Sequence, residues 1–274
     1  MKIEKIWAVF FSPVKNTEKI VMAAAGAAAE KAGVREIRLF DMTNPQARTG
    51  SVCFGEGDLV FMAVPTYAGR VPNKLRPFIE EQIIGSGALG AALVTYGNRS
   101  FDDSLTELAA LMQENGFTVV GGGAFVCQHP FAGKLAAGRP AAEDLAEAAD
   151  LGRQIVGKVL EDRLTTPVFQ GNCPPGPYYV PKGTDGKPAV FLKAKPKTDE
   201  SRCIGCGLCV QRCPMGSIEE DKDFAVTGIC IKCQACIASC PTGAKYMTDE
   251  AFLSHKQMLE ENFADKKREN RLFY

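Results

Sequence analysis

Two copies of one cysteine pattern constrain this chain more than any other feature. The first copy reads CIGCGLCVQRCP from Cys203, and the second reads CIKCQACIASCP from Cys230, a shift of 27 residues. Both have the form CxxCxxCxxxCP. A repeat of this kind means that one small unit is duplicated, so we expect this region to fold as two related halves.

The spacing of the cysteines indicates iron rather than zinc. Three thiolates two residues apart can bind one face of a cubic cluster from a single loop, while a helical turn carries the fourth towards the other cluster. Zinc ribbons instead pair two CxxC motifs across a longer gap and need no third cysteine at this spacing. The pattern therefore predicts two cross-ligated 4Fe-4S clusters. One is assigned to Cys203, Cys206, Cys209 and Cys240, and the other to Cys230, Cys233, Cys236 and Cys213.

The distribution of cysteines also argues against a disulfide framework. Eight of the 11 cysteines lie between Cys203 and Cys240. Dense cysteines in an otherwise ordinary chain indicate metal ligation. The scattered Cys53, Cys127 and Cys173 are expected to be structural, since a free cysteine behaves as a small apolar side chain.

The first part of the chain alternates between apolar runs and helical stretches. We expect strands at 6–11, 34–40, 59–64, 91–95 and 117–126. Helices are expected between and after them, at 17–31, 74–82, 102–114 and 140–159. Strands separated by helices form a parallel sheet that is covered on both faces. This part is therefore predicted to be α/β, a doubly wound five-stranded parallel sheet with a ligand at the carboxyl ends of its strands.

The remainder divides into three segments. Residues 165–197 are rich in proline and glycine, as in GNCPPGPYYVPKGTDGKP, and are expected to form a linker or a wrapping arm. A charged helix is expected from Asp249 to about Arg268. The predicted boundaries are 1–163 for the α/β domain, 164–196 for the linker, 197–248 for a small α+β domain with two clusters, and 249–274 for the C-terminal helix.

Charge and hydropathy argue against several classes of protein. Lys and Arg together number 32, as do Asp and Glu, so no net field favours nucleic acid or an anionic membrane. No apolar run reaches the roughly 18 residues of a membrane-spanning helix. The amino terminus also lacks the small-residue cleavage site of a secretory signal. We therefore expect a cytoplasmic protein that binds neither nucleic acid nor membranes.

Three loops that follow expected strands carry candidate ligand residues. The first, SPVKNTEK from Ser12, leads into an alanine-rich helix, whose amino-terminal amides and dipole favour an anion. The others are PTYAGRVP from Pro65 and TYGNRSFDD from Thr95. Each places an aromatic residue near a glycine, so that a planar ring can stack while backbone amides approach its edge. For the first loop, the alternative is an ordinary turn in which Ser12 caps the helix.

These three loops together resemble the flavodoxin family, in which the first loop holds the FMN phosphate and the other two flank the isoalloxazine ring. The cysteine block, at 196–247, resembles bacterial-type two-cluster ferredoxins and includes every ligand and both prolines. The order of the parts is similar to that of flavodoxin–ferredoxin fusion proteins from anaerobic prokaryotes. By this resemblance the FMN site comprises Ser12, Val14, Lys15, Asn16, Thr17, Pro65, Thr66, Tyr67, Ala68, Gly69, Thr95, Tyr96, Gly97, Asn98, Arg99, Phe101 and Asp102.

The first loop departs from the flavodoxin pattern, which is close to S/T-x-T-G-x-T. Only Ser12 and Thr17 are kept, whereas Val14 replaces a hydroxyl and Lys15 replaces the glycine. A non-glycine residue at that turn costs on the order of 1 kcal/mol if its φ is positive. Backbone amides remain, and Lys15 supplies a compensating charge. We therefore interpret the loop as a modified phosphate site.

The resemblance implies an iron–sulfur flavoprotein with two [4Fe-4S] clusters and FMN. Single electrons would pass between clusters and flavin, and on to or from a redox protein or a small acceptor, so the chain would be an oxidoreductase or electron-transfer protein, with a homodimer as one arrangement. One alternative is a plain ferredoxin-type carrier whose flavodoxin-like domain binds no flavin and serves for docking. Another is a cluster-based sensor. Arg99 and His129 are weaker candidates, for which a surface ion pair and a satisfied histidine are the alternatives.

Overall fold

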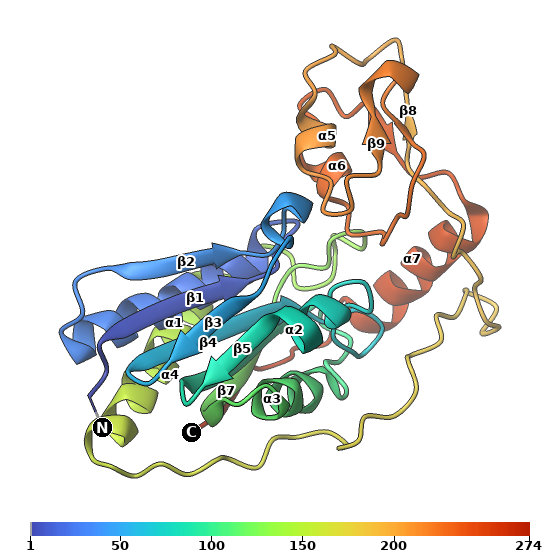
Figure 1. The fold of residues 1–274 in the computed structure, drawn as a ribbon. Coiled ribbons are helices and arrows are strands. Elements are labelled where there is room, and N and C mark those ends of the chain that lie inside the picture. Colours follow the sequence, from blue (N-terminus) through green and yellow to red (C-terminus); the bar gives the residue numbers. More distant parts are fainter. Residues whose placement is uncertain (1) are drawn as a thin grey trace.

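The largest sheet of the protein has the strand order of a flavodoxin. The structure, a computed structural model, describes residues 2–274. Six strands pair in the order β12-β7-β6-β4-β1-β2 (Figure 1). All pairs except that of β12 with β7 are parallel, so the five parallel strands have the flavodoxin-like order. The predicted α/β fold is thus confirmed. The parallel strands are β1 (Lys5–Phe10), β2 (Ile37–Asp41), β4 (Asp58–Pro65), β6 (Leu89–Tyr96) and β7 (Thr118–Val126).

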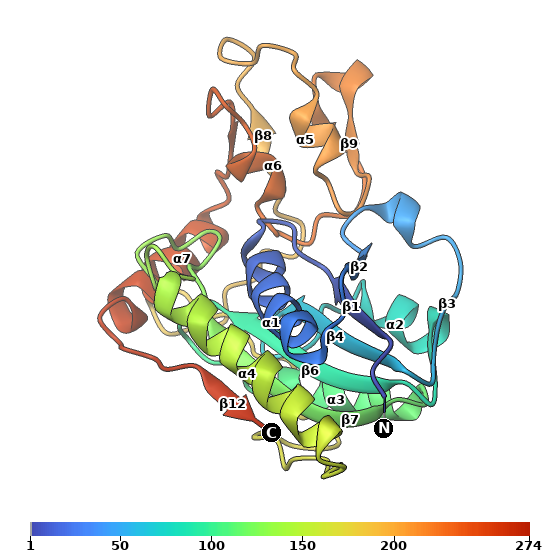
Figure 2. The same cartoon turned by 90° about the vertical axis from the view of Figure 1, so that its left-hand side faces the viewer.

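Helices cover both faces of this sheet. α1 (Asn16–Ala32) and α4 (Ala142–Leu160) lie side by side on one face (Figure 2), and α2 (Arg76–Gln82) and α3 (Ser104–Glu114) lie on the other (Figure 1). The central strands β4, β6 and β7 are apolar along nearly their whole length because they are buried between two layers of helices, whereas the edge strand β2 is partly exposed. α1 and α4 approach closely at Gly152, where a Cβ would lie 2.1 Å from the carbonyl oxygen of Ala24.

The C-terminal segment differs from the predicted single helix. α7 (Glu250–Phe263) ends before the expected Arg268, and the chain continues as β12 (Arg271–Phe273), antiparallel to β7 at the edge of the sheet. The side-chain amide of Asn98 donates hydrogen bonds to the carbonyls of Phe263 and Lys266, both at 2.8 Å, and so binds the end of the helix. The edge of β7 offers unpaired backbone groups, which β12 satisfies.

The proline-rich segment 164–196 is an arm that runs along the α/β domain to the cysteine region (yellow in Figure 1). The Asp103 carboxylate accepts hydrogen bonds from the backbone amides of Asn172 and Gly176, both at 2.8 Å. The Arg70 guanidinium donates to the Gly176 carbonyl at 2.5 Å and lies 4.8 Å from the centre of the Tyr178 ring. The arm is therefore bound to the surface of the domain.

The cysteine region consists of short elements in two related halves. In the first half Gly205 and Gly207 have positive φ angles of 65° and 69°, and the repeat-related Lys232 and Gln234 have φ angles of 57° and 65°. The two copies therefore share one backbone conformation even where glycine is replaced. The elements are β8 (Lys197–Thr198), α5 (Leu208–Gln211), β9 (Ile218–Glu219), η2 (Glu220–Lys222), β10 (Ala225–Val226), α6 (Ala235–Ala238) and β11 (Lys245–Tyr246).

Three small elements of the α/β domain were not expected from the sequence. They are η1 (Pro45–Ala47), β3 (Val52–Gly55) and β5 (Ile83–Ser86). β3 and β5 pair with each other in a separate parallel sheet. Among the helices of residues 2–274, none carries an apolar stretch long enough to cross a lipid bilayer.

Candidate functional site

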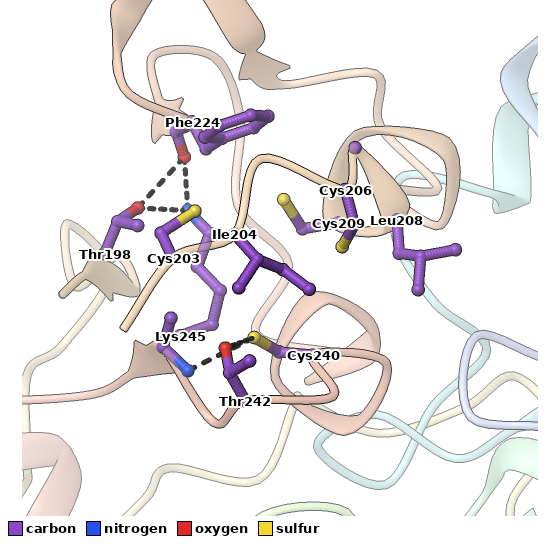
Figure 3. A pocket seen from close by; sticks show the side chains of 12 residues that line it. Thr198, Cys203, Ile204, Cys206, Leu208, Cys209, Phe224, Cys240, Thr242 and Lys245 are labelled. Carbon is purple, nitrogen blue, oxygen red and sulfur yellow. Dashed lines mark hydrogen bonds between the residues drawn. The ribbon is translucent and has the colours of Figure 1, made fainter. Parts of the chain in front are cut away.

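Four cysteines line each of two small cavities in the cysteine region. Figure 3 shows the first cavity, to which the first repeat contributes three cysteines and the second repeat one. The second cavity has the reverse composition. This is the grouping that the spacing predicts, and ligation of iron by these thiols stays a proposal. The first cavity holds Cys203, Cys206, Cys209 and Cys240, and the second holds Cys230, Cys233, Cys236 and Cys213.

The surroundings of these thiols fit iron–sulfur clusters. The amide of Ser217 donates to the Cys213 sulfur at 3.4 Å, and the repeat-related amide of Ala244 donates to the Cys240 sulfur at 3.2 Å. Burial raises the pKa values of Cys233 and Cys236 to about 12. Thiolates at such positions require positive charge nearby, which the iron of a cluster supplies. Within residues 2–274, no three Cys, His, Asp or Glu side chains converge on the position of a single metal ion.

The first loop after β1 keeps part of an anion site. Lys15 has a φ of 68°, the left-handed conformation that favours the glycine it replaces. The Ser12 hydroxyl accepts a hydrogen bond from the amide of Glu18 at 3.0 Å, so it does bind the first turn of α1, as in the alternative interpretation. Within residues 2–274, the amides of Asn16 and Thr17 have no hydrogen-bond partner. These amides, at the start of a 17-residue helix, fit a phosphate group.

The loops after β4 and β6 meet the first loop, as predicted for a ligand site at the carboxyl ends of the strands. The hydroxyls of Thr17 and Thr95 are 2.8 Å apart, and the amide of Thr66 donates to the Thr95 carbonyl at 2.7 Å. Ala68 and Gly69 form a tight turn with φ angles of 50° and 80°. Residues of all three predicted loops, including Pro65, therefore lie together at one end of the sheet.

Two aromatic residues of the predicted flavin site lie in the core. Tyr96 and Phe101 are 5% and 6% exposed, and their ring centres are 5.4 Å apart. The Tyr96 hydroxyl donates to the Glu269 carbonyl at 3.3 Å. In this arrangement the Tyr96 ring is not presented for stacking on a flavin, because the C-terminal segment covers the end of β6. Tyr67 is the half-buried aromatic residue of the β4 loop.

Comparisons with known proteins give a family match for the cysteine region. The 4Fe-4S binding domain family matches residues 196–219 and again residues 227–243. The chain joins a flavodoxin-like domain to a 4Fe-4S ferredoxin region. No curated protein gives a match.

Solved structures similar to the flavodoxin-like domain include a flavodoxin from the domain Archaea, with 20% identity and a TM-score of 0.43. The match covers 57% of this chain and 99% of that flavodoxin. Flavodoxin 2 from Bacillus cereus has 18% identity and a TM-score of 0.41, and covers 56% of this chain and 99% of that chain. Rubredoxin oxygen:oxidoreductase from Desulfovibrio gigas has 15% identity and a TM-score of 0.36, and covers 60% of this chain but 38% of that chain.

The ferredoxin region contacts the carboxyl end of the flavodoxin-like sheet through its second cavity. The Arg48 guanidinium donates to the Pro214 carbonyl at 2.6 Å, and Ile231 packs against the core of the flavodoxin-like domain. Burial raises the pKa of Tyr67 well above 10.0, and the Cys233 and Cys230 thiols add to this shift. The β4 loop therefore lies close to the second cavity, the one lined by Cys213 and Cys230.

The arm and the C-terminal segment cover the outer side of the β4 and β6 loops. The amide of Tyr179 donates to the Ala68 carbonyl at 2.9 Å. The Arg99 guanidinium pairs with Asp102 and lies 3.9 Å from the centre of the Tyr179 ring. Arg99 therefore matches the ion-pair alternative, because its guanidinium is paired with the Asp102 carboxylate.

His129 is a satisfied histidine in this structure. Its Nδ1 accepts a hydrogen bond from the amide of Ala132 at 3.3 Å, and a Cβ on Gly97 would lie 2.2 Å from its ring. Burial, with smaller contributions from the nearby His255 and Arg99, lowers the pKa of His129 to about 3. A neutral ring packed against the β6 loop has a structural role, in agreement with the alternative interpretation.

Sequence reasoning missed several residues that connect the parts. Arg48 and Tyr179 lie in segments without a periodic pattern, so nothing in the sequence identified their partners. Lys245 lines the first cysteine cavity. A signal for it did exist, because the repeat aligns Lys245 with Ile218 and so places a charge where the other copy has an apolar residue.

Proposed function

We propose that this chain is an iron–sulfur flavoprotein that transfers electrons between two 4Fe-4S clusters, a bound FMN and a redox partner. The observation that carries the proposal is the division of eight cysteines into two cavities of four, joined to a flavodoxin-like domain. When bound, a flavin exchanges one or two electrons and each cluster exchanges one. A dense set of free thiols suits a reducing compartment such as the cytoplasm.

The residues of this chain would provide distance and orientation. The free amides of Asn16 and Thr17 would hold the FMN phosphate, and the β4 loop with Tyr67 would lie between the flavin and the second cavity. This supports the cluster of Cys230, Cys233, Cys236 and Cys213 as the nearer one. The arm and C-terminal segment cover the β6 loop, which favours a protein partner at the ferredoxin region over a small acceptor at the flavin.

A second candidate is a plain ferredoxin-type carrier whose flavodoxin-like domain serves for docking. It is favoured by the first loop, where Val14 has no hydroxyl and the Ser12 hydroxyl is bonded to the helix, and by the buried Tyr96. Under this alternative the domain supplies only the surface that binds the ferredoxin region, through Arg48 and Ile231.

An anaerobic reductive titration distinguishes the two. The flavoprotein is expected to accept four electrons per chain, two at the flavin and one at each cluster, with bleaching of both chromophores. The carrier is expected to accept two electrons and to show no flavin absorption after incubation with excess FMN and desalting. Uptake of fewer than two electrons by protein with its full iron content would contradict both candidates.

A further inference from the structure

Lys245 breaks the symmetry of the two cluster cavities. The repeat aligns it with Ile218, and each of these residues lines one cavity, Ile218 the second and Lys245 the first. Ile218 is 5% exposed and packs with the apolar residues around Cys236. Two backbones of the same form thus place an apolar side chain beside one set of cysteines and an amino group beside the other.

The Lys245 side chain is buried without an opposite charge from the protein. It is 3% exposed, and its Nζ donates to the Thr198 hydroxyl at 2.7 Å and to the Phe224 carbonyl (Figure 3). Within residues 2–274, no carboxylate forms an ion pair with it. A buried ammonium group is costly unless negative charge lies nearby, so its position needs a partner that these two neutral oxygens do not supply.

The cysteines of the first cavity, bound to iron as thiolates, would provide this negative charge. Lys245 lines the first cavity together with Cys203, Cys209 and the other two cysteines assigned to it. The Lys245 side chain is therefore part of the wall of the first cavity and not of the second.

We propose that Lys245 is a redox-tuning residue that raises the reduction potential of the cluster held by Cys203, Cys206, Cys209 and Cys240 above that of the other cluster. The inference rests on the proposed function, because it requires both clusters. Reduction adds one negative charge to a cluster, and a nearby positive charge in a site of low polarity stabilises the reduced form. The second cavity has Ile218 in this place. Its own lysine, Lys232, is only half-buried and donates to the carbonyls of Leu192 and Cys230, so water screens its charge and its stabilisation of a reduced cluster is weaker.

The consequence is a direction within the ferredoxin region. The second cavity adjoins the flavodoxin-like domain through Arg48 and Ile231, so the first cavity is the more distant one. At equilibrium a single electron would therefore reside on the distant cluster, where an external redox partner meets the chain.

The test is an EPR-monitored redox titration of full-length protein with its eight irons, as wild type and as Lys245→Ile, Lys245→Arg and Lys195→Met. Lys245→Ile gives the first cavity the residue of the second. Lys195→Met is the matched control, because its Nζ also donates to a backbone carbonyl, that of Thr227, but the residue is exposed. In Lys245→Ile, the cluster that has the higher potential in the wild type is expected to be harder to reduce. At a fixed applied potential, its ratio of reduced to oxidised form should fall at least tenfold, which corresponds to a reduction potential lower by about 59 mV. Lys245→Arg and Lys195→Met are expected to change it less than twofold.

Two outcomes would overturn the proposal. One is an unchanged pair of potentials in Lys245→Ile with full iron content. The other is equal loss of iron from Lys245→Ile and Lys245→Arg, which would mean that Lys245 acts by packing. Loss of iron from Lys245→Ile alone supports a role for the charge. Wild-type protein that binds no iron would instead refute the proposed function.

Discussion

The buried ion pair between Arg70 and Glu107 is predicted to hold the β4 loop and the arm in place. The Arg70 Nε donates to the Glu107 carboxylate at 2.8 Å and its Nη2 at 2.6 Å, and the amide of Val71 donates to the same carboxylate at 2.8 Å. The side chains are 8% and 3% exposed. Arg70 also binds the arm at Gly176, so one side chain connects helix α3, the β4 loop and the arm.

The change Arg70→Met removes the charge but keeps an apolar stem. It leaves the Glu107 carboxylate buried, with Arg76 at 3.6 Å as its remaining cation. Breaking a buried pair in this way costs about 3–5 kcal/mol of unfolding free energy. With a urea m-value of about 2 kcal/mol per M, the unfolding midpoint of the flavodoxin-like domain is expected to fall by roughly 2 M.

Fluorescence of Trp7, the single tryptophan, provides the assay, because it lies in β1 and packs edge-on against Phe54 at 5.2 Å. Its signal therefore follows the flavodoxin-like domain and not the ferredoxin region. Arg153→Gln is the control, since Arg153 and Asp150 form an exposed pair at 3.8 Å that contributes less than about 1 kcal/mol. A loss of stability in Arg70→Met no larger than that in Arg153→Gln would mean that the buried ion pair does not stabilise the domain.

Three further changes test the ligands of the second cluster, the first loop and the attachment of the arm. Cys213→Ala is expected to abolish the EPR signal of the cluster assigned to the second cavity while the other persists; loss of only the other signal would contradict cross-ligation. Lys15→Gly is expected to raise the unfolding free energy by about 1 kcal/mol, because it relieves a positive φ in a non-glycine residue. A urea unfolding midpoint below that of the wild type would contradict this expectation. Burial alone would raise the pKa of Asp103, but hydrogen bonds from Asn172 and Gly176 hold this pKa below 3.8. The stability that the ionised carboxylate gives to the attachment of the arm is therefore complete above pH 3.8 and is lost as the pH falls through the pKa of the folded state. Asp103→Asn should therefore speed proteolysis of the arm at pH 7, and wild-type kinetics in this variant would disprove the link.

The fold of the flavodoxin-like domain was predictable because its central strands β4, β6 and β7 are buried on both faces. Apolar runs such as that of β4, which is buried along nearly all its length, are evident in the sequence and differ from the helical periods between them. The C-terminal strand was not predictable, since Arg271–Phe273 is three residues long and owes its conformation to the exposed edge of β7. Its pairing is a tertiary effect without a local signal.

The cysteine cavities were predictable from spacing, whereas the contacts that join the domains were not. A loop that must place three sulfurs around one volume restricts the sequence to a fixed pattern, so Cys203 and its repeat partner identify the site. The contact of Arg48 with Pro214 joins residues 166 positions apart and depends on how two domains meet. Tyr96 shows the opposite error, since an aromatic beside a glycine suggested a flavin contact and the covering C-terminal segment was unforeseen.

The iron and flavin content of protein purified without oxygen is the first measurement to make, because it tests whether this chain holds both kinds of cofactor. An iron–sulfur flavoprotein of this kind is expected to contain about eight irons per chain, in two four-iron clusters, together with about one FMN released by acid. Eight irons with no flavin, even after addition of FMN, would contradict the flavoprotein and leave the ferredoxin-type carrier. About one or two metal ions per chain in place of eight irons would contradict the assignment of the cysteine cavities themselves.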